Sequence, residues 1–161
     1  MKKTTNILIL GLFVLLFSCS EEDSVNTDTP SGSYLKHYGT TYPLTKAFVL
    51  KFSYEDNAKR FMLNLGGDEM NINDDDLSGS GEGVTVYAMD EFKAGTYTIL
   101  DDSWAVSDWI PNPNGPGSGN ESSLEGGTLK VISASNPIEI EITGSDTEVY
   151  YKGNATIQGE Y

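Results

Sequence analysis

The stretch IEIEIT, residues 138–143, decides the fold, because its three isoleucines alternate with polar residues. In an extended chain successive side chains point to opposite sides, so this hexapeptide has one apolar side and one polar side. The stretch TLKVI, residues 128–132, repeats the pattern, with Leu129 and Val131 opposite Lys130. One dry and one wet face per strand is typical of antiparallel sheets. Both stretches therefore predict strands of such a sheet.

The same period of two continues along the rest of the chain. It is present in FVLKFSYE at 48–55, RFMLNL at 60–65, VTVYAM at 84–89 and GTYTIL at 95–100. About eight or nine such strands follow one another at intervals of roughly ten residues, with Gly, Asn, Asp and Pro between them. We therefore expect an all-β domain, either an antiparallel β-sandwich or a lipocalin-like barrel. A sandwich core is expected to hold Phe48, Leu50, Phe52, Phe61, Leu63, Val86, Ile99, Val131 and Ile140.

The N-terminus has the pattern of an export signal. Lys2 and Lys3 precede the apolar run 7–17. That run has about 11 residues, whereas a membrane-spanning helix needs about 20, so residues 1–18 are predicted to be a signal peptide. Residues 19–32 have no apolar period and are predicted to form a disordered, acidic tether. Residues 33–161 then form a single domain.

A resemblance sharpens this prediction. Leu16-Phe17-Ser18-Cys19 resembles the lipobox of bacterial lipoproteins, and the following Ser-Glu-Glu-Asp resembles the export signal of surface lipoproteins in Bacteroidota-type bacteria. The resemblance implies that Cys19 carries acyl chains and holds the protein on the outer membrane, exposed at the cell surface. The alternative for the Cys is a plain secretory signal in which it is incidental. The alternative for the acids is an ordinary solvated linker.

A weaker resemblance covers much of the domain. FKAGTYTI at 92–99, GGTLKV at 126–131, IEIEITG at 138–144 and VYYKGNAT at 149–156 are similar to small all-β lipoproteins common in gut Bacteroidota. That family, largely of unknown function, implies a β-sandwich or a lipocalin-like barrel, and it offers no catalytic residues to transfer.

Charge and composition exclude several classes of function. The chain has 10 Lys and Arg against 24 Asp and Glu, and removal of residues 1–18 would leave 8 against 24, a net charge of −16. Nucleic-acid binding needs a basic face and is not predicted. One histidine, His37, and one acylated cysteine cannot build a zinc site. Carboxylate pairs are unavoidable among so many acids and indicate no specific glycosidase. We therefore predict no enzyme.

The stretch NINDDDLSGSGE, residues 71–82, is a weak candidate for a Ca²⁺ site, and no other cofactor is predicted. Asn71, Asn73, Asp75 and Glu82 fall at positions one, three, five and twelve of a calcium-loop spacing. The position that requires a glycine is occupied by Asp76, and no helices are predicted on either side. The alternative is a solvated acidic loop.

The segment 101–127 contains the candidate ligand-binding residues. Trp104 and Trp109 lie near Asp101, Asp102 and Asp108, and residues 111–123 are predicted to be irregular. Flat aromatic rings beside carboxylates can stack on sugar rings and accept their hydroxyl groups. The alternative is that one or both tryptophans cap the open end of the core, because burial of an aromatic side chain is a large packing gain.

Three functions remain open at this point. The first is a non-catalytic, lipid-anchored surface protein that binds a glycan or a partner protein. The second is a lipocalin-like carrier with a small apolar ligand inside a barrel. The third is an adhesin or fimbrial accessory, for which an unpaired edge strand able to accept a donated strand would be expected.

Overall fold

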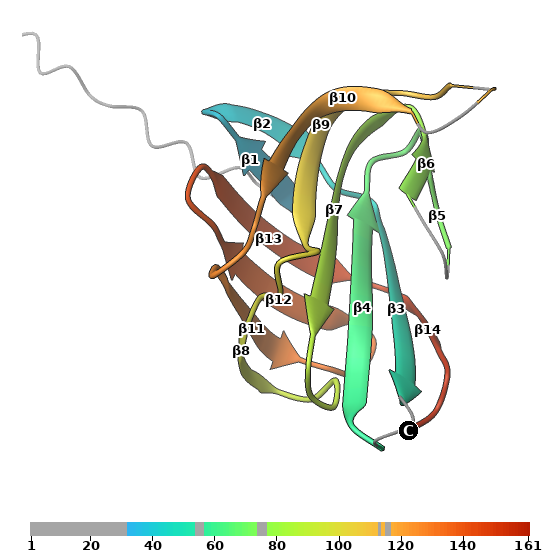
Figure 1. Ribbon diagram of the computed structural model, residues 1–161, viewed down its shortest axis with the longest axis vertical. Helices are drawn as coiled ribbons and strands as arrows, with labels where there is room; N and C mark the ends of the chain where they lie inside the picture. The colour runs from blue at the N-terminus through green and yellow to red at the C-terminus, as the bar shows by residue number, and fades with distance from the viewer. Residues whose placement is uncertain (1–31, 54–56, 74–76, 113, 115–116) are drawn as a thin grey trace, which may run out of the picture.

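The protein is all-β, with two large sheets packed against each other (Figure 1). The computed structural model describes residues 32–53, 57–73, 77–112, 114 and 117–161. The predicted signal peptide 1–18, the predicted lipidation site Cys19 and nearly all of the predicted tether lie outside these residues. Within the described ranges, no helix is long and apolar enough to cross a membrane.

The first sheet is antiparallel throughout. Its strands, in spatial order, are β2 (Thr40–Pro43), β1 (Tyr34–His37), β13 (Thr147–Gly153), β12 (Ile138–Thr143), β11 (Thr128–Ser133) and β8 (Gly95–Thr98). The stretch IEIEIT is thus β12, which pairs with β11 and β13 in the middle of the sheet. All three isoleucines of β12 are fully buried, and the predicted orientation of this strand is confirmed.

The second sheet is antiparallel except at one edge. Its strands, in spatial order, are β10 (Ser118–Ser123), β9 (Trp104–Ile110), β7 (Gly81–Ala88), β4 (Lys59–Gly66), β3 (Lys46–Ser53) and β14 (Thr156–Gln158), the last of which runs parallel to β3. A small hairpin of β5 (Met70–Ile72) and β6 (Leu77–Gly79) completes the fourteen strands of the described chain.

The core lies between the two sheets, whose strands run obliquely across each other (Figure 1). The predicted sandwich is confirmed, and the described residues form no closed barrel. The fully buried large side chains of this core are Leu35, Phe61, Leu63, Leu65, Ile99, Leu124, Leu129, Ile138, Ile140 and Ile142. Phe61 also makes edge contacts with two further aromatic rings, Phe92 at 5.1 Å and Tyr97 at 5.2 Å between centroids.

The sequence predicted fewer strands than the structure contains. Four of the additional strands, β2, β5, β6 and β14, have only three or four residues, which is too short to show an alternation. A fifth, β10, lies inside the segment 111–123 that was predicted to be irregular. Its serine, glycine and asparagine residues have low strand propensity, but pairing with the backbone of β9 outweighs that preference.

The prediction for the inner face of β3 was wrong. Val49, which faces Leu63 across the β3–β4 pair, belongs to the core cluster, whereas Phe48, Leu50 and Phe52 lie on the outer face of the sheet. The outer face carries the apolar Phe48, Leu50 and Phe52, whereas the inner face combines Val49 with Lys51 and Ser53, so alternation alone favours the wrong face. The register with β4 decides, because directly opposite residues share a face.

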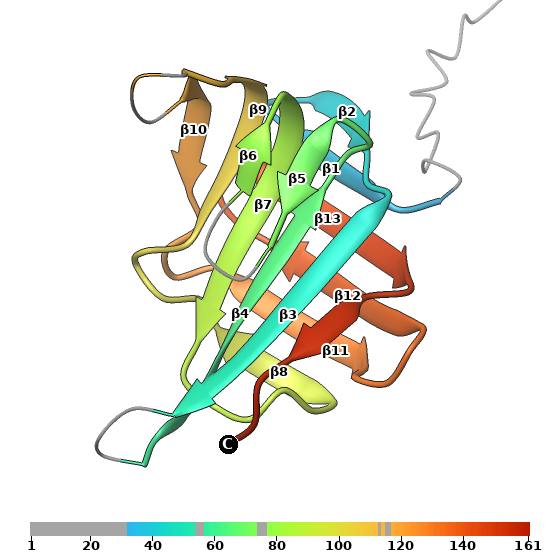
Figure 2. The ribbon, with the colours of Figure 1, turned by 90° about the vertical axis from the view of Figure 1, so that its right-hand side faces the viewer.

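The hairpin β5–β6 explains why the outer face of the second sheet is also apolar. Figure 2 shows the hairpin lying in front of β7 and β4, with β9 and β10 beside it. Met70 and Leu77 are buried there against Gly83, where an added Cβ would lie 2.8 Å from either side chain. Glycine at this position therefore lets the hairpin approach the sheet closely. Strand β9, which carries the tryptophans, lies next to β7 and thus beside the part of the sheet that the hairpin covers.

Candidate binding face

The two tryptophans of the candidate site lie side by side on β9. Their rings are stacked, with 6.1 Å between centroids and 18° between planes, and both side chains are half-buried. In a regular strand, residues five apart point to opposite faces of the sheet. An irregularity in β9 must therefore bring Trp104 and Trp109 to the same side.

That irregularity is a β-bulge at Asp108. Trp109 is paired with Gly81 of β7 and Val106 with Gly83, so three steps along β9 are matched by two steps along β7. Asp108 has a φ of 55°, in the left-handed region that Asp tolerates better than most residues. One extra residue moves every later side chain to the opposite face. The bulge thus turns Trp109 from the core side to the outer side.

The tryptophans do not form the cap on the core that was considered as an alternative. Trp104 is paired with Thr85, while its neighbour Ala105 points into the core cluster. Neither indole belongs to that cluster. The pair is held from the side by the connection to β10, because a Cβ on Gly117 would lie 2.5 Å from Cε2 of Trp109. The backbone at Gly117 therefore lies directly against the indole.

The structure separates the predicted carboxylates. Asp101 and Asp102 are exposed in the turn before β9, whereas the exposed Asp108 lies at the bulge. Six residues of extended chain separate Asp102 from Asp108 by roughly 20 Å, at about 3.3 Å per residue. The three acids therefore do not surround one small ligand, and only Asp108 lies at the same end of β9 as Trp109.

A carboxylate that the sequence did not point to lies closer to the pair. Glu121 of β10 is exposed and sits opposite Val106, so it shares the outer face with both tryptophans and falls between them along the strand direction. Ser123 is opposite Trp104 on the same face. No signal in the sequence could have shown this, because the segment has no alternation and was predicted to be irregular.

The residues of the candidate Ca²⁺ loop are spread over two elements. Asn71 lies in the hairpin opposite Ser78, and the carbonyl of Asn73 accepts a hydrogen bond from Asn64 Nδ2 at 3.0 Å. Glu82 is the second residue of β7, and Asp75 lies outside the described residues. In the part of the chain that is described, no group of three or more His, Cys, Asp or Glu side chains is arranged to hold a metal ion.

Glu82 does contribute to the electrostatics near the bulge. Burial raises the pKa of its carboxyl, and the negative charges of Asp108 and Glu69 add to this rise. The end of β9 that carries Trp109 is therefore a negatively charged environment. A neutral or cationic ligand suits it better than an anionic one.

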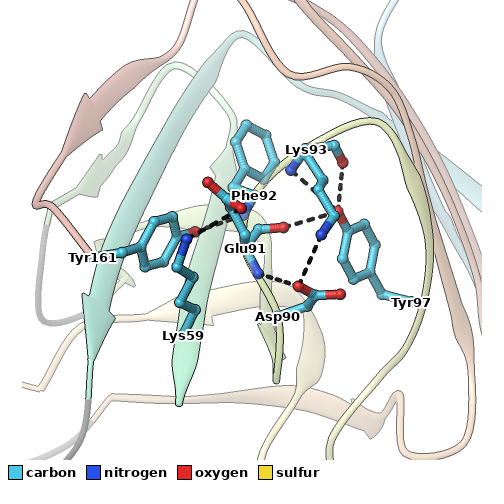
Figure 3. A network of polar contacts seen from close by, with 7 residues as sticks. All are labelled: Lys59, Asp90, Glu91, Phe92, Lys93, Tyr97 and Tyr161. Atoms are coloured by element: carbon cyan, nitrogen blue, oxygen red, sulfur yellow. Dashed lines mark hydrogen bonds and ion pairs between the residues drawn. The ribbon is translucent and has the colours of Figure 1, made fainter. Parts of the chain in front are cut away.

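The polar contacts drawn in Figure 3 hold separate elements of the fold together. The phenol oxygen of Tyr161 accepts the backbone N–H of Phe92 at 2.5 Å, and Lys59 Nζ lies 5.1 Å from the centroid of the Tyr161 ring and 3.3 Å from a carboxylate oxygen of Glu91. The Tyr97 hydroxyl donates to the backbone carbonyl of Glu91 at 2.9 Å. These contacts tie the turn after β7 to β4 and to the residues after β14.

Comparisons with known proteins give no guidance: no protein-family model, no curated protein and no solved structure matches this chain significantly.

Proposed function

We propose that this protein is a non-catalytic glycan-binding protein whose ligand stacks on Trp104 and Trp109. The observation that carries the proposal is the bulge at Asp108, which turns an indole out of the interior. Burial of a tryptophan is one of the largest packing gains available to a fold. Bulges that re-aim a side chain and residues with left-handed backbone are concentrated at functional sites.

The chemistry of the face suits a saccharide. A pyranose ring has an apolar side of C–H groups that can lie on an indole, and hydroxyl groups at its edge that donate to carboxylates. Glu121 and Asp108 supply such acceptors beside the tryptophans, and Ser123 adds a hydroxyl. The negative charge of this region favours neutral over acidic sugars.

We further propose that the domain is held on the outer membrane, at the cell surface, by acyl chains on Cys19. The support is the order of a basic head, an apolar run, the lipobox-like LFSC and an acidic stretch in the sequence. Metabolic labelling with a palmitate analogue should mark the wild type and not Cys19→Ala, and protease added to intact cells should remove the domain. An unlabelled wild-type chain would overturn the anchor.

The glycan proposal is tested on a glycan array with the detergent-solubilised full chain. Trp104→Ala and Trp109→Ala should each weaken binding by about tenfold, which corresponds to about 1.4 kcal/mol. Tyr38→Ala is the matched control, because Tyr38 is an aromatic residue with 63% exposure in the turn between β1 and β2 of the other sheet. The proposal fails if the wild type binds no glycan, or if the tryptophan variants bind as the control does.

Of the two other functions, the carrier loses support and the adhesin or fimbrial accessory keeps some. A carrier of the lipocalin type needs a closed barrel, which the described strands do not form. The assembly function needs an open edge, and β10, a six-residue strand, ends the second sheet with only β9 beside it. A partner strand could add there through backbone hydrogen bonds.

A further inference from the structure

The outer face of the first sheet contains a groove that the proposed glycan site does not use. Its volume is about 660 Å³, within the range of about 300–1,000 Å³ for small-ligand sites. It lies across β1, β13 and β12 and is bordered by the β12–β13 turn and by the turn after β1. The side chains that define its chemistry are Tyr34, Lys36, Glu141, Asp146, Glu148 and Tyr150.

The floor of the groove is aromatic. Leu35 points into the core, so its neighbour Tyr34 points outward, and yet Tyr34 is only 7% exposed. Its hydroxyl donates to Glu148 Oε1 at 2.7 Å. The ring of Tyr150 lies 6.3 Å from that of Tyr34 with a tilt of 38°, and its hydroxyl donates to Glu139 Oε1 at 3.0 Å. Both rings are therefore fixed by hydrogen bonds to carboxylates.

The phenol of Tyr34 keeps its proton beside Glu148. Burial, together with the hydrogen bond to Glu148, raises the pKa of Tyr34 to about 12, so the phenol stays a proton donor across the physiological range. Glu148 is thereby held in place as a hydrogen-bond acceptor at the edge of the floor. A carboxylate held beside an aromatic surface is a favourable setting for a positive charge.

The lining has an excess of negative charge. Glu141, Asp146 and Glu148 face one basic residue, Lys36, among the lining residues. Glu141 is also ion-paired with Lys130 of β11 at 2.8 Å, so its charge is largely compensated at the rim. Asp146 and Glu148 remain as the acids nearest to the tyrosine floor, in a chain whose net charge is already −14.

We propose that this groove binds an organic cation, namely the ammonium or guanidinium group of a basic peptide side chain. The aliphatic stem would lie over the Tyr34 and Tyr150 rings, and the charged group would reach Glu148 and Asp146. An anionic ligand would meet the carboxylates of Asp146 and Glu148, which outnumber Lys36, the residue opposite Glu148 in the β1–β13 pair. A neutral ligand would leave this excess of negative charge unbalanced. The groove lies on the opposite sheet from the tryptophans, so failure of one proposal leaves the other unaffected.

The test uses N-acetyl-arginine amide and its neutral isostere N-acetyl-citrulline amide as probes. Both are titrated against the full chain in a neutral detergent, with ¹³C labels on the tyrosine rings and detection by NMR. The arginine probe should shift the Tyr34 and Tyr150 signals, and the citrulline probe should not. A triarginine peptide in a further arm should bind more tightly if the natural ligand is a peptide. Equal response to arginine and citrulline overturns the proposal.

Two variants show whether the groove is responsible. Glu148→Gln keeps an acceptor for the Tyr34 hydroxyl and removes the charge, and it should weaken binding of the arginine probe by about fivefold. Glu125→Gln removes the same charge from the exposed turn before β11 and should leave binding unchanged. If both variants bind alike, the attraction comes from the net charge of the protein, and the groove is not a site. Shifts of these tyrosines by a neutral monosaccharide would also contradict the proposal.

Discussion

Replacement of Asn64 by leucine should destabilise the protein by a magnitude that follows from its hydrogen bonds. Asn64 is fully buried on the outer face of β4. Its Nδ2 donates to the carbonyl of Asn73 at 3.0 Å, and its Oδ1 accepts from the Thr85 hydroxyl at 2.8 Å. The side chain therefore joins β4 to the end of the covering hairpin and to β7, next to the tryptophan-bearing strand.

The two lost bonds do not have equal cost. Asn73 is exposed, so water can replace Asn64 at its carbonyl, whereas Thr85 is 3% exposed and its hydroxyl would be left without a partner. A loss of about 1 kcal/mol for the bond to Thr85, of up to about 1 kcal/mol for the bond to Asn73 and of about 1–2 kcal/mol for the buried orphan gives roughly 2–4 kcal/mol for Asn64→Leu. At this chain length, that lowers Tm by roughly 6–15 °C.

A double-mutant cycle measured by urea unfolding tests this reasoning. Thr85→Val alone should cost about 1–2 kcal/mol, because it strips Asn64 Oδ1 of its donor. In the Asn64→Leu background the same change removes the orphan hydroxyl and should be neutral or stabilising, so the two effects are strongly non-additive. Thr128→Val, at an exposed strand position, is the control. Additive effects of the two substitutions would refute the hydrogen-bond account.

Two further predictions concern the tryptophan pair and the single histidine. Gly117→Ala should displace the indole of Trp109, because the added methyl would lie 2.5 Å from it. Tryptophan fluorescence should then shift, and the free energy of unfolding should fall by about 1–3 kcal/mol. Gly95→Ala is the control: its methyl meets only ordinary contacts, so it should not perturb the fluorescence. Burial lowers the pKa of His37 below its usual 6.5, against a smaller opposing effect of Asp146. The unfolded chain then binds a proton that the folded chain does not, so the unfolding free energy should drop between pH 7.5 and 5.5 in the wild type and less so in His37→Gln. Parallel pH profiles would contradict this.

Much of the fold could be predicted from the sequence because alternation is unambiguous where one face of a strand is polar. The glutamates of β12 leave only one possible orientation for Ile138, Ile140 and Ile142, and the structure has that orientation. In β3 the face with Phe48 is the more apolar one and yet lies outside, so the choice of Val49 as the inner residue needed the register with β4 and the presence of a covering hairpin. Neither is a local property of the chain.

The candidate site was only partly predictable for a related reason. Trp104 and Trp109 could be singled out by residue type, but their meeting depends on one extra residue at Asp108, and no rule of alternation locates a bulge in advance. Glu121 was missed because its strand forms by pairing with β9 and not by its own propensity. The types of side chain in the site could thus be predicted from the sequence. That Trp104, Trp109 and Glu121 share one face follows from the pairing of β9 with its neighbours.

The placement of the two proposed sites bears on how an anchored protein would meet its ligands. The predicted tether joins the domain at Gly32, which lines the groove on the first sheet, while the tryptophans lie on the outer face of the second sheet. If the proposed anchor on Cys19 holds, a tether leading to Gly32 would place the groove nearer to the membrane than the tryptophan face. The tryptophan face would then be the one that meets a ligand in the medium. The two proposed sites lie on opposite sides of the domain because each sheet of a sandwich has only one outer face.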